Sequence, residues 1–139
     1  MKRILTLALA SALALPALAH AEKESPLWLR HQQISPDGSQ IAFCYKGDIY
    51  TVPTAGGQAL RLTSNAAYDG TPIWSPDSRS LAFSSDREGS KEVYIVKADG
   101  SGLRRLTYSS EKEVPVAFLD GSMLLFQSYV MPDVKDGMY

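Results

Sequence analysis

One stretch of this chain is written twice, at residues 35–63 and again at 75–107. Each copy opens with Ser-Pro-Asp, continues through an alternating run that ends in Ala-Phe, holds a second run around a tyrosine, and closes with Arg-Leu-Thr. Pro36 and Pro76 are 40 residues apart. Repeats of this length that consist of short strands and tight turns are typical of β-propeller blades. The repeat therefore predicts an all-β fold.

Each copy divides into four short segments of strand-like composition, separated by turns rich in Gly, Pro and Asp. The expected strands are 31–34, 40–45, 49–52 and 59–62 in the first copy, and 71–74, 80–84, 92–97 and 103–106 in the second. The second copy has four additional residues, which we place in a longer hairpin at 85–90. Four antiparallel strands joined by hairpins form one blade. We therefore predict a first blade at about 31–63 and a second at about 71–107.

A third copy begins at about residue 113 and does not finish. Residues 116–121 and 123–126 are similar to the Asp-containing turn and the second strand of the other copies. Nothing after Ser128 matches the run around the tyrosine or the closing Leu-Thr. The prediction is an incomplete β-propeller of four-stranded antiparallel blades, with two full blades and part of a third at about 113–139. Because an open array leaves apolar blade faces exposed to solvent, we expect Leu81, Phe83 and Phe126 to lack some of their packing partners. We also expect this chain to be the N-terminal piece of a longer protein, or to complete itself by association.

The first 21 residues have the features of a secretory signal peptide. Two basic residues precede a mainly apolar run, and Ala19-His20-Ala21 offers a cleavage site. The apolar run is shorter than the roughly 20 residues that span a bilayer. The predicted mature chain, 22–139, carries a net charge of about −3 and therefore no basic footprint for nucleic acid. Its single cysteine, Cys44, excludes an internal disulfide.

Residue types that carry chemistry are sparse in the mature chain. His31 is its one histidine, and no serine lies in a Gly-x-Ser-x-Gly context. Asp37, Asp77 and Asp120 recur at one turn position, but each stands alone, whereas calcium takes six to eight converging oxygen ligands. The glycine pairs lack the helix and lysine of a phosphate-binding loop. We therefore predict no catalytic residue, no cofactor and no metal ligand.

Asp86 and Arg87, in the longer hairpin of the second copy, are the candidate site residues. An acid and a base at a blade edge can hold adjacent blades together through charged hydrogen bonds, or contact a ligand at the mouth of the propeller. Other recurring residues are interpreted structurally. Cys44 is expected to be a small packed residue, the arginines of the outermost strands (Arg61, Arg104 and Arg105) to be solvated edge charges, and the aromatics (Tyr50, Trp74, Tyr94 and the phenylalanines) to be inter-blade core.

The repeated segments of this chain, from Ile34 to about Phe126, resemble the TolB-type, WD-like β-propeller repeat. Within that group the chain is most similar to the N-terminal propeller of bacterial tricorn-type serine peptidases. The resemblance rests on Pro-Leu-Trp-Leu-Arg at 26–30, Lys-Gly-Asp-Ile-Tyr-Thr-Val-Pro at 46–53, and Ala-Tyr-Asp at 67–69 ahead of Pro-Ile-Trp-Ser-Pro-Asp at 72–77.

The resemblance implies a propeller that gates or docks peptides for a serine peptidase domain further along a longer chain. None of that domain's motifs matches a position here, so the chain itself is expected to have no hydrolytic activity. Its expected partners are peptides or proteins at the propeller surface and the remainder of its own chain, with no nucleic acid and no membrane span in the mature chain. The expected location is the Gram-negative periplasm.

Two alternatives stay open. A non-enzymatic TolB-like envelope scaffold would have a globular domain before its propeller, whereas only 13 residues, 22–34, precede the first repeat turn here. A prolyl-oligopeptidase-like enzyme would carry its α/β-hydrolase domain after the propeller.

Overall fold

Alternating apolar residues and short turns produce a meander of short antiparallel strands. The computed structural model describes residues 28–129, and within that range the regular structure consists of ten strands. The first sheet contains β1 (Arg30–Ile34), β2 (Gln40–Tyr45), β3 (Asp48–Pro53) and β4 (Leu60–Arg61); the second contains β5 (Asp69–Trp74), β6 (Ser80–Glu88), β7 (Ser90–Lys97) and β8 (Arg104–Arg105); the third pairs β9 (Glu113–Phe118) with β10 (Leu124–Ser128). Every pairing is antiparallel, which confirms the predicted fold class.

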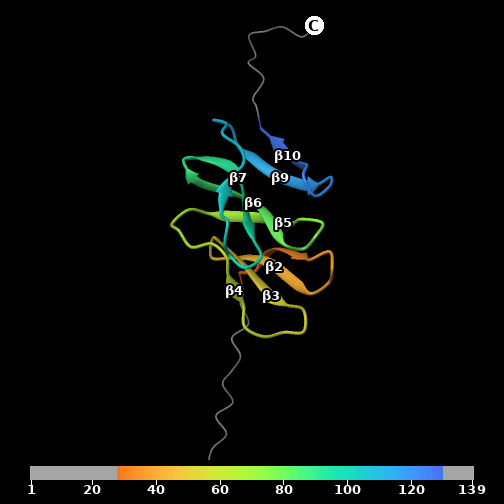
Figure 1. Ribbon diagram of the computed structural model, residues 1–139. Helices are drawn as coiled ribbons and strands as arrows, with labels where there is room; N and C mark the ends of the chain where they lie inside the picture. Colours follow the sequence, from red (N-terminus) through yellow and green to blue (C-terminus); the bar gives the residue numbers. More distant parts are fainter. Residues whose placement is uncertain (1–27, 130–139) are drawn as a thin grey trace, which may run out of the picture.

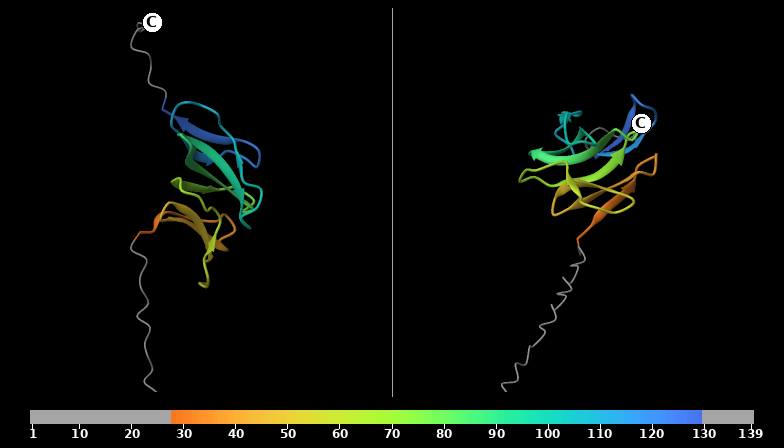
Figure 2. Two further views of the ribbon diagram at one scale, coloured as in Figure 1. Left: turned by 90° about the vertical axis from the view of Figure 1, so that its left-hand side faces the viewer. Right: turned by 60° about the horizontal axis from the view of Figure 1, so that its bottom comes forward.

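The three sheets stack on one another in chain order (Figures 1 and 2). In each four-stranded sheet the spatial order equals the sequence order, and β5 contacts the first sheet through β1, β2 and β3. The predicted signal peptide (1–21) and the end of the predicted third blade (130–139) lie outside the described residues. No helix in the range 28–129 has the length and apolar character needed to cross a bilayer.

The β2–β3 hairpin shows how local sequence sets the register. Lys46 and Gly47 both have positive φ, 51° and 88°, so the two-residue turn has the twist that matches its flanking strands. Tyr45 then pairs with Asp48, and the register continues unbroken to the pair Gln40 and Pro53.

The β6–β7 hairpin differs from the prediction of a loop at 85–90. β6 continues to Glu88 and β7 starts at Ser90, with only Gly89 at the tip, where φ is 99°. The register shifts between Ser85 and Glu88, so the additional residues form a bulged extension of both strands. The sequence of this segment is polar, which favoured a loop, but side-chain bonds to the neighbouring linker hold it in extended conformation.

A core cluster joins the first two sheets. Side chains of the first blade meet larger, mainly aromatic ones of the second; the cluster consists of Ala42, Cys44, Ile49, Leu62, Trp74, Leu81, Phe83, Tyr94 and Val96. The predicted inter-blade role is confirmed for Trp74, Phe83 and Tyr94, which are all buried. Burial of Cys44 in the same cluster confirms that it is a packed small residue.

Two expectations about the open faces are corrected. Leu81 and Phe83 are fully buried, because the first sheet covers them, so they do not lack partners. Phe126 is 39% exposed, as expected. Tyr50 is only half-buried, because it lies in an apolar groove of 720 Å³ on the outward face of the first sheet rather than between two blades.

Gly38 occupies a turn position that a side chain would strain. Its φ is 73°, and no atom lies within 4 Å of a Cβ placed there, so only backbone conformation opposes a substitution. We expect Gly38→Ala to lower the free energy of unfolding by about 1 to 2 kcal/mol, measured by urea denaturation. The matched control is Gly121→Ala in the third sheet, where space is also open but φ is not in the left-handed region. An equal loss in both variants would contradict the backbone explanation.

Candidate functional site at the joint between the first two blades

The candidate residues Asp86 and Arg87 lie at one end of the stacked sheets. In an antiparallel meander, the β2–β3 hairpin, the β6–β7 hairpin and the segment that links β4 to β5 fall at the same end of the strands. Two hydrogen bonds show this contact: Asp69 N donates to Gly47 O at 2.7 Å, and Tyr68 N donates to Asp86 Oδ1 at 2.8 Å. We call this region, residues 45–48, 63–69 and 86–90, the linker end.

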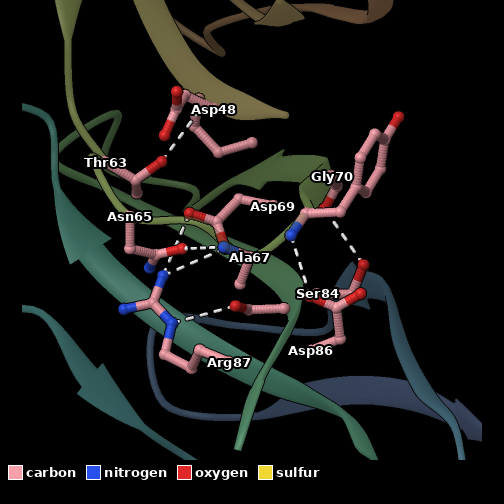
Figure 3. A network of polar contacts seen from close by, with 12 residues as sticks. Asp48, Thr63, Asn65, Ala67, Asp69, Gly70, Ser84, Asp86 and Arg87 are labelled. Atoms are coloured by element: carbon pink, nitrogen blue, oxygen red, sulfur yellow. Dashed lines mark hydrogen bonds and ion pairs between the residues drawn. The ribbon is translucent and has the colours of Figure 1, made fainter. Parts of the chain in front are cut away.

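Arg87 forms the central ion pair of the linker end (Figure 3). Its Nη2 donates to both carboxylate oxygens of Asp69 at 3.0 Å, and its Nε donates to Ser85 Oγ at 2.9 Å. Asp69 is fully buried, and the guanidinium carbon of Arg87 lies 4.5 Å from the ring centroid of Tyr94. Because Asp69 also bonds to the first blade through its backbone, Arg87 stabilises the point at which the chain passes from one blade to the next.

Asp86 binds the same linker from the other side. Its carboxylate accepts the Tyr68 N–H, and its carbonyl accepts the Gly89 N–H at 3.0 Å, which closes the hairpin. Both predicted site residues therefore contact residues 68–69, the segment between the blades. Contact with a ligand stays a prediction for this pair.

Cys44 and Tyr68 complete the joint from the side of the first blade. The Cys44 thiol donates to the Asp69 carbonyl at 3.0 Å, and its Sγ lies 3.9 Å from the Tyr68 hydroxyl. Burial raises the pKa of the Cys44 thiol, and burial also raises the pKa of Tyr68. Since the thiolate is the reactive form of cysteine, Cys44 has the properties of a structural hydrogen-bond donor.

Two of the three edge arginines form ion pairs, contrary to their interpretation as solvated charges. Arg61 Nη2 lies 2.6 Å from Asp48 Oδ2, and Arg105 Nη2 lies 2.8 Å from Glu92 Oε1. Both acids are buried, and each arginine also donates through Nε to the carbonyl of the threonine two residues later. Arg104 is exposed, in line with the prediction.

A threonine two residues after each of these arginines bonds to the strand that carries the buried acid. We call each set of arginine, acid and threonine a clamp. Thr63 Oγ1 accepts the Ile49 N–H at 3.0 Å, and Thr107 Oγ1 accepts the Val93 N–H at 2.9 Å. The closing Arg-Leu-Thr thus fixes the short outer strand to an acid at or near the start of the third strand of the blade. The signal was present in the sequence, because an acid stands two residues before the repeated tyrosine in both copies.

Hydrogen bonds favour the ionised form of Glu92, the acid of the second clamp. Burial by itself raises the pKa of Glu92, but hydrogen bonds from the Thr107 and Ser90 side chains and the Arg105 guanidinium together lower it below its ordinary value. Thr107 Oγ1 donates to Glu92 Oε2 at 2.6 Å, and Ser90 Oγ donates to Glu92 Oε1 at 2.9 Å.

The recurring turn aspartates lie at the opposite end of the strands, where each organises its own turn. The Ser35 hydroxyl donates to Asp37 Oδ1 at 2.6 Å and the Ser39 N–H donates to the same oxygen at 3.0 Å. These bonds lower the pKa of Asp37 from 3.8 to about 2, and a bond from Ser75 lowers the pKa of Asp77 in the same way. The Ser78 hydroxyl accepts the Asp37 N–H at 3.1 Å, which joins the turns of neighbouring blades.

These turns predict a loss of stability in acid. A carboxyl whose pKa is lower in the folded chain stabilises the fold above its unfolded pKa, and this contribution disappears as the pH falls through the folded value. The melting temperature should therefore fall between about pH 4 and pH 2. Asp37→Asn and Ser35→Ala should each flatten this decline, measured by circular dichroism, because they remove the acceptor and the donor of one bond. An unchanged decline in both variants would contradict the assignment.

The described residues bring no catalytic group together. His31 is exposed in β1, and none of the hydrogen bonds within 28–129 joins it to a serine. In the same range no three His, Cys, Asp or Glu side chains converge as metal ligands do. The absence of catalysis, cofactor and metal stays a prediction.

Stacked four-stranded antiparallel sheets that repeat the same clamp define the chain as a β-propeller module. Its structure is similar to one described as TolB of Agrobacterium tumefaciens, with a TM-score of 0.67 and 32% identity over 82% of this chain and 42% of the other. It also shares the fold of the tricorn protease, with a TM-score of 0.59 and 16% identity over 73% of this chain and 11% of that chain.

The chain belongs to the family described as the tricorn protease N-terminal β-propeller domain, whose sequence profile matches residues 26–134. A curated relative, tricorn protease homolog 1 of Streptomyces coelicolor, is 31% identical over 107 residues, which are 76% of this chain and 10% of the relative. The chain thus spans about a tenth of that relative. These findings confirm the predicted resemblance and identify a propeller module of the kind found in TolB-like and peptidase-like proteins.

Proposed function

We propose that this chain is the propeller module of an exported, tricorn-like serine peptidase, in which it docks or gates peptides and supplies no catalytic residue. The observation that carries the proposal is the family match over 26–134, which covers all of the described structure. The relative's name supports a peptidase setting. The signal-like residues 1–21 support export, and the proposed location is the periplasm.

The polar groups of the linker end are engaged within the fold, which supports a module that supplies no catalytic group of its own. Arg87 bonds to the Asp69 carboxylate and Asp86 bonds to the Tyr68 N–H, so these groups fix the linker to the second blade. A catalytic base needs a nucleophile within hydrogen-bond reach, and His31 has none among the described residues. A rigid scaffold with surface pockets but no assembled nucleophile fits a docking module.

A TolB-like envelope scaffold is the second candidate. It is favoured by one observation, the greater likeness to the structure described as TolB, at 32% identity, than to the tricorn protease, at 16%. In that case the propeller would bind partner proteins and no peptidase domain would belong to the same protein.

Detection of the native protein in the source cell separates the two candidates. An antibody against residues 28–129 should recognise a polypeptide much longer than 139 residues in the periplasmic fraction. A fluorophosphonate probe, which labels active serine nucleophiles, should label the immunoprecipitated polypeptide. A periplasmic protein without label would favour the scaffold, and a cytoplasmic protein would overturn export.

A further inference from the structure

A pocket of 480 Å³ opens at the linker end of the first blade. Its volume lies within the range of small-ligand sites. It is lined by Trp28, Arg30, Cys44, Lys46, Gly47 and Tyr68. The pocket therefore lies between the start of the first strand, the β2–β3 hairpin and the linker that leads into the second blade.

The charged side chains that line this pocket are both cationic. Arg30 and Lys46 are exposed, and within residues 28–129 neither forms an ion pair. The Lys46 ammonium lies 5.3 Å from the ring centroid of Tyr45, which orients it without neutralising it. Two cations in one pocket with no carboxylate in its lining favour an anionic ligand.

The second blade shows that the fold itself does not require this arrangement. Strand pairing makes Gly70, opposite Ser84, the counterpart of Arg30, which lies opposite Cys44. Asp86 is then the counterpart of Lys46, and its carboxylate is already bonded to the Tyr68 N–H (Figure 3). The one charge at these positions of the second blade is used within the fold, whereas the two cations of the first blade form no ion pair with a carboxylate in the described part of the chain.

Two aromatic rings give the pocket apolar walls. Trp28 is 62% exposed and Tyr68 is 38% exposed, so both can contact a ligand. A Cβ at Gly70 would lie 2.9 Å from Tyr68 Cε1, so glycine at this position leaves the space that the ring occupies. Rings beside cations match a ligand that carries an anion next to apolar groups.

We propose that this pocket binds an acidic side chain of a peptide, Asp or Glu, with its carboxylate between Arg30 and Lys46 and its apolar neighbours against Trp28 and Tyr68. The inference rests on the proposed docking function and adds its specificity. An extended peptide places the next residues on either side of the acidic one, where the two rings lie at the pocket wall.

Calorimetric titration with two blocked peptides tests the proposal. The peptides are acetyl-Ala-Leu-Glu-Leu-Ala-amide and its Gln counterpart, which differ only in one charge. The purified protein should bind the Glu peptide at least about tenfold more tightly at low salt, a difference of about 1.4 kcal/mol. Arg30→Gln and Lys46→Gln should each remove most of this preference. Arg104→Gln, which removes an exposed arginine outside the pocket, should preserve it.

The remaining outcomes distinguish the inference from the docking function. Equal affinity for the two peptides would overturn the acidic specificity and leave peptide docking standing. Equal affinity of the Glu peptide and of a Gln peptide with a free C-terminus would overturn the assignment to a side chain. Failure of both blocked peptides to bind would overturn peptide docking at this pocket and the specificity with it. Circular dichroism of each variant excludes misfolding as the cause.

Discussion

Phe83→Ala is expected to lower the free energy of unfolding by about 3 to 5 kcal/mol, the usual cost of removing a fully buried phenylalanine. Phe83 is completely buried, and its ring stacks on Tyr94 with centroids 5.9 Å apart. The first sheet covers it on one side, so the resulting cavity lies between two blades and cannot be filled without moving them. Urea denaturation followed by fluorescence measures the effect, because Trp74 belongs to the same core cluster.

The matched control is Phe43→Ala, at the same position of the first repeat. Phe43 stacks on Tyr50 with centroids 5.6 Å apart, but it borders the open apolar groove of the first sheet. Its loss removes fewer contacts, so we expect roughly half the cost. If Phe83→Ala does not fold, Phe83→Leu should still show a loss of about 1 to 2 kcal/mol. Equal costs at positions 43 and 83 would contradict the explanation that the neighbouring sheet covers Phe83 but not Phe43.

Local sequence explains why most strands could be predicted. The second strand of the first repeat, 40–45, begins and ends where it was predicted, because its alternation is regular and a two-residue turn follows it. The β6–β7 hairpin could not be predicted from local pattern. Its extension depends on Arg87 reaching Asp69 and on Asp86 reaching Tyr68, 18 residues away in each case.

Long-range pairing also explains the errors at the site. Arg61 and Arg105 looked like edge charges because the buried acids that they contact, Asp48 and Glu92, are 13 residues away in sequence. The sequence also could not predict which blade faces are open and which are covered, for a different reason. Phe43 and Phe83 have the same sequence context, and only their place in the stack determines which one borders a groove. The cationic pocket could not be predicted from the sequence, because Arg30, Lys46 and Tyr68 come from separate segments.

Arg87→Met should destabilise the fold by about 3 kcal/mol or more, because it leaves the carboxylate of Asp69 buried without its cation. Methionine keeps an unbranched apolar side chain at this position, so the loss reports the removal of the charged group rather than of the whole side chain. The cost should be smaller in the double variant Arg87→Met with Asp69→Asn, since the buried charge is then absent. Urea denaturation of the two single variants and the double variant gives the coupling energy of the pair.

Arg61→Met is the comparison that shows whether burial of the ion pair determines this cost. The Arg61 side chain is 46% exposed, against 15% for Arg87, so solvent screens its pair with Asp48. We expect a loss of about 1 kcal/mol or less there. Similar losses for Arg61→Met and Arg87→Met would show that burial of the ion pair does not determine the cost. A loss confined to Arg87→Met would instead show that this buried pair within the second blade anchors Asp69, whose backbone bonds to Gly47 and Cys44 of the first blade.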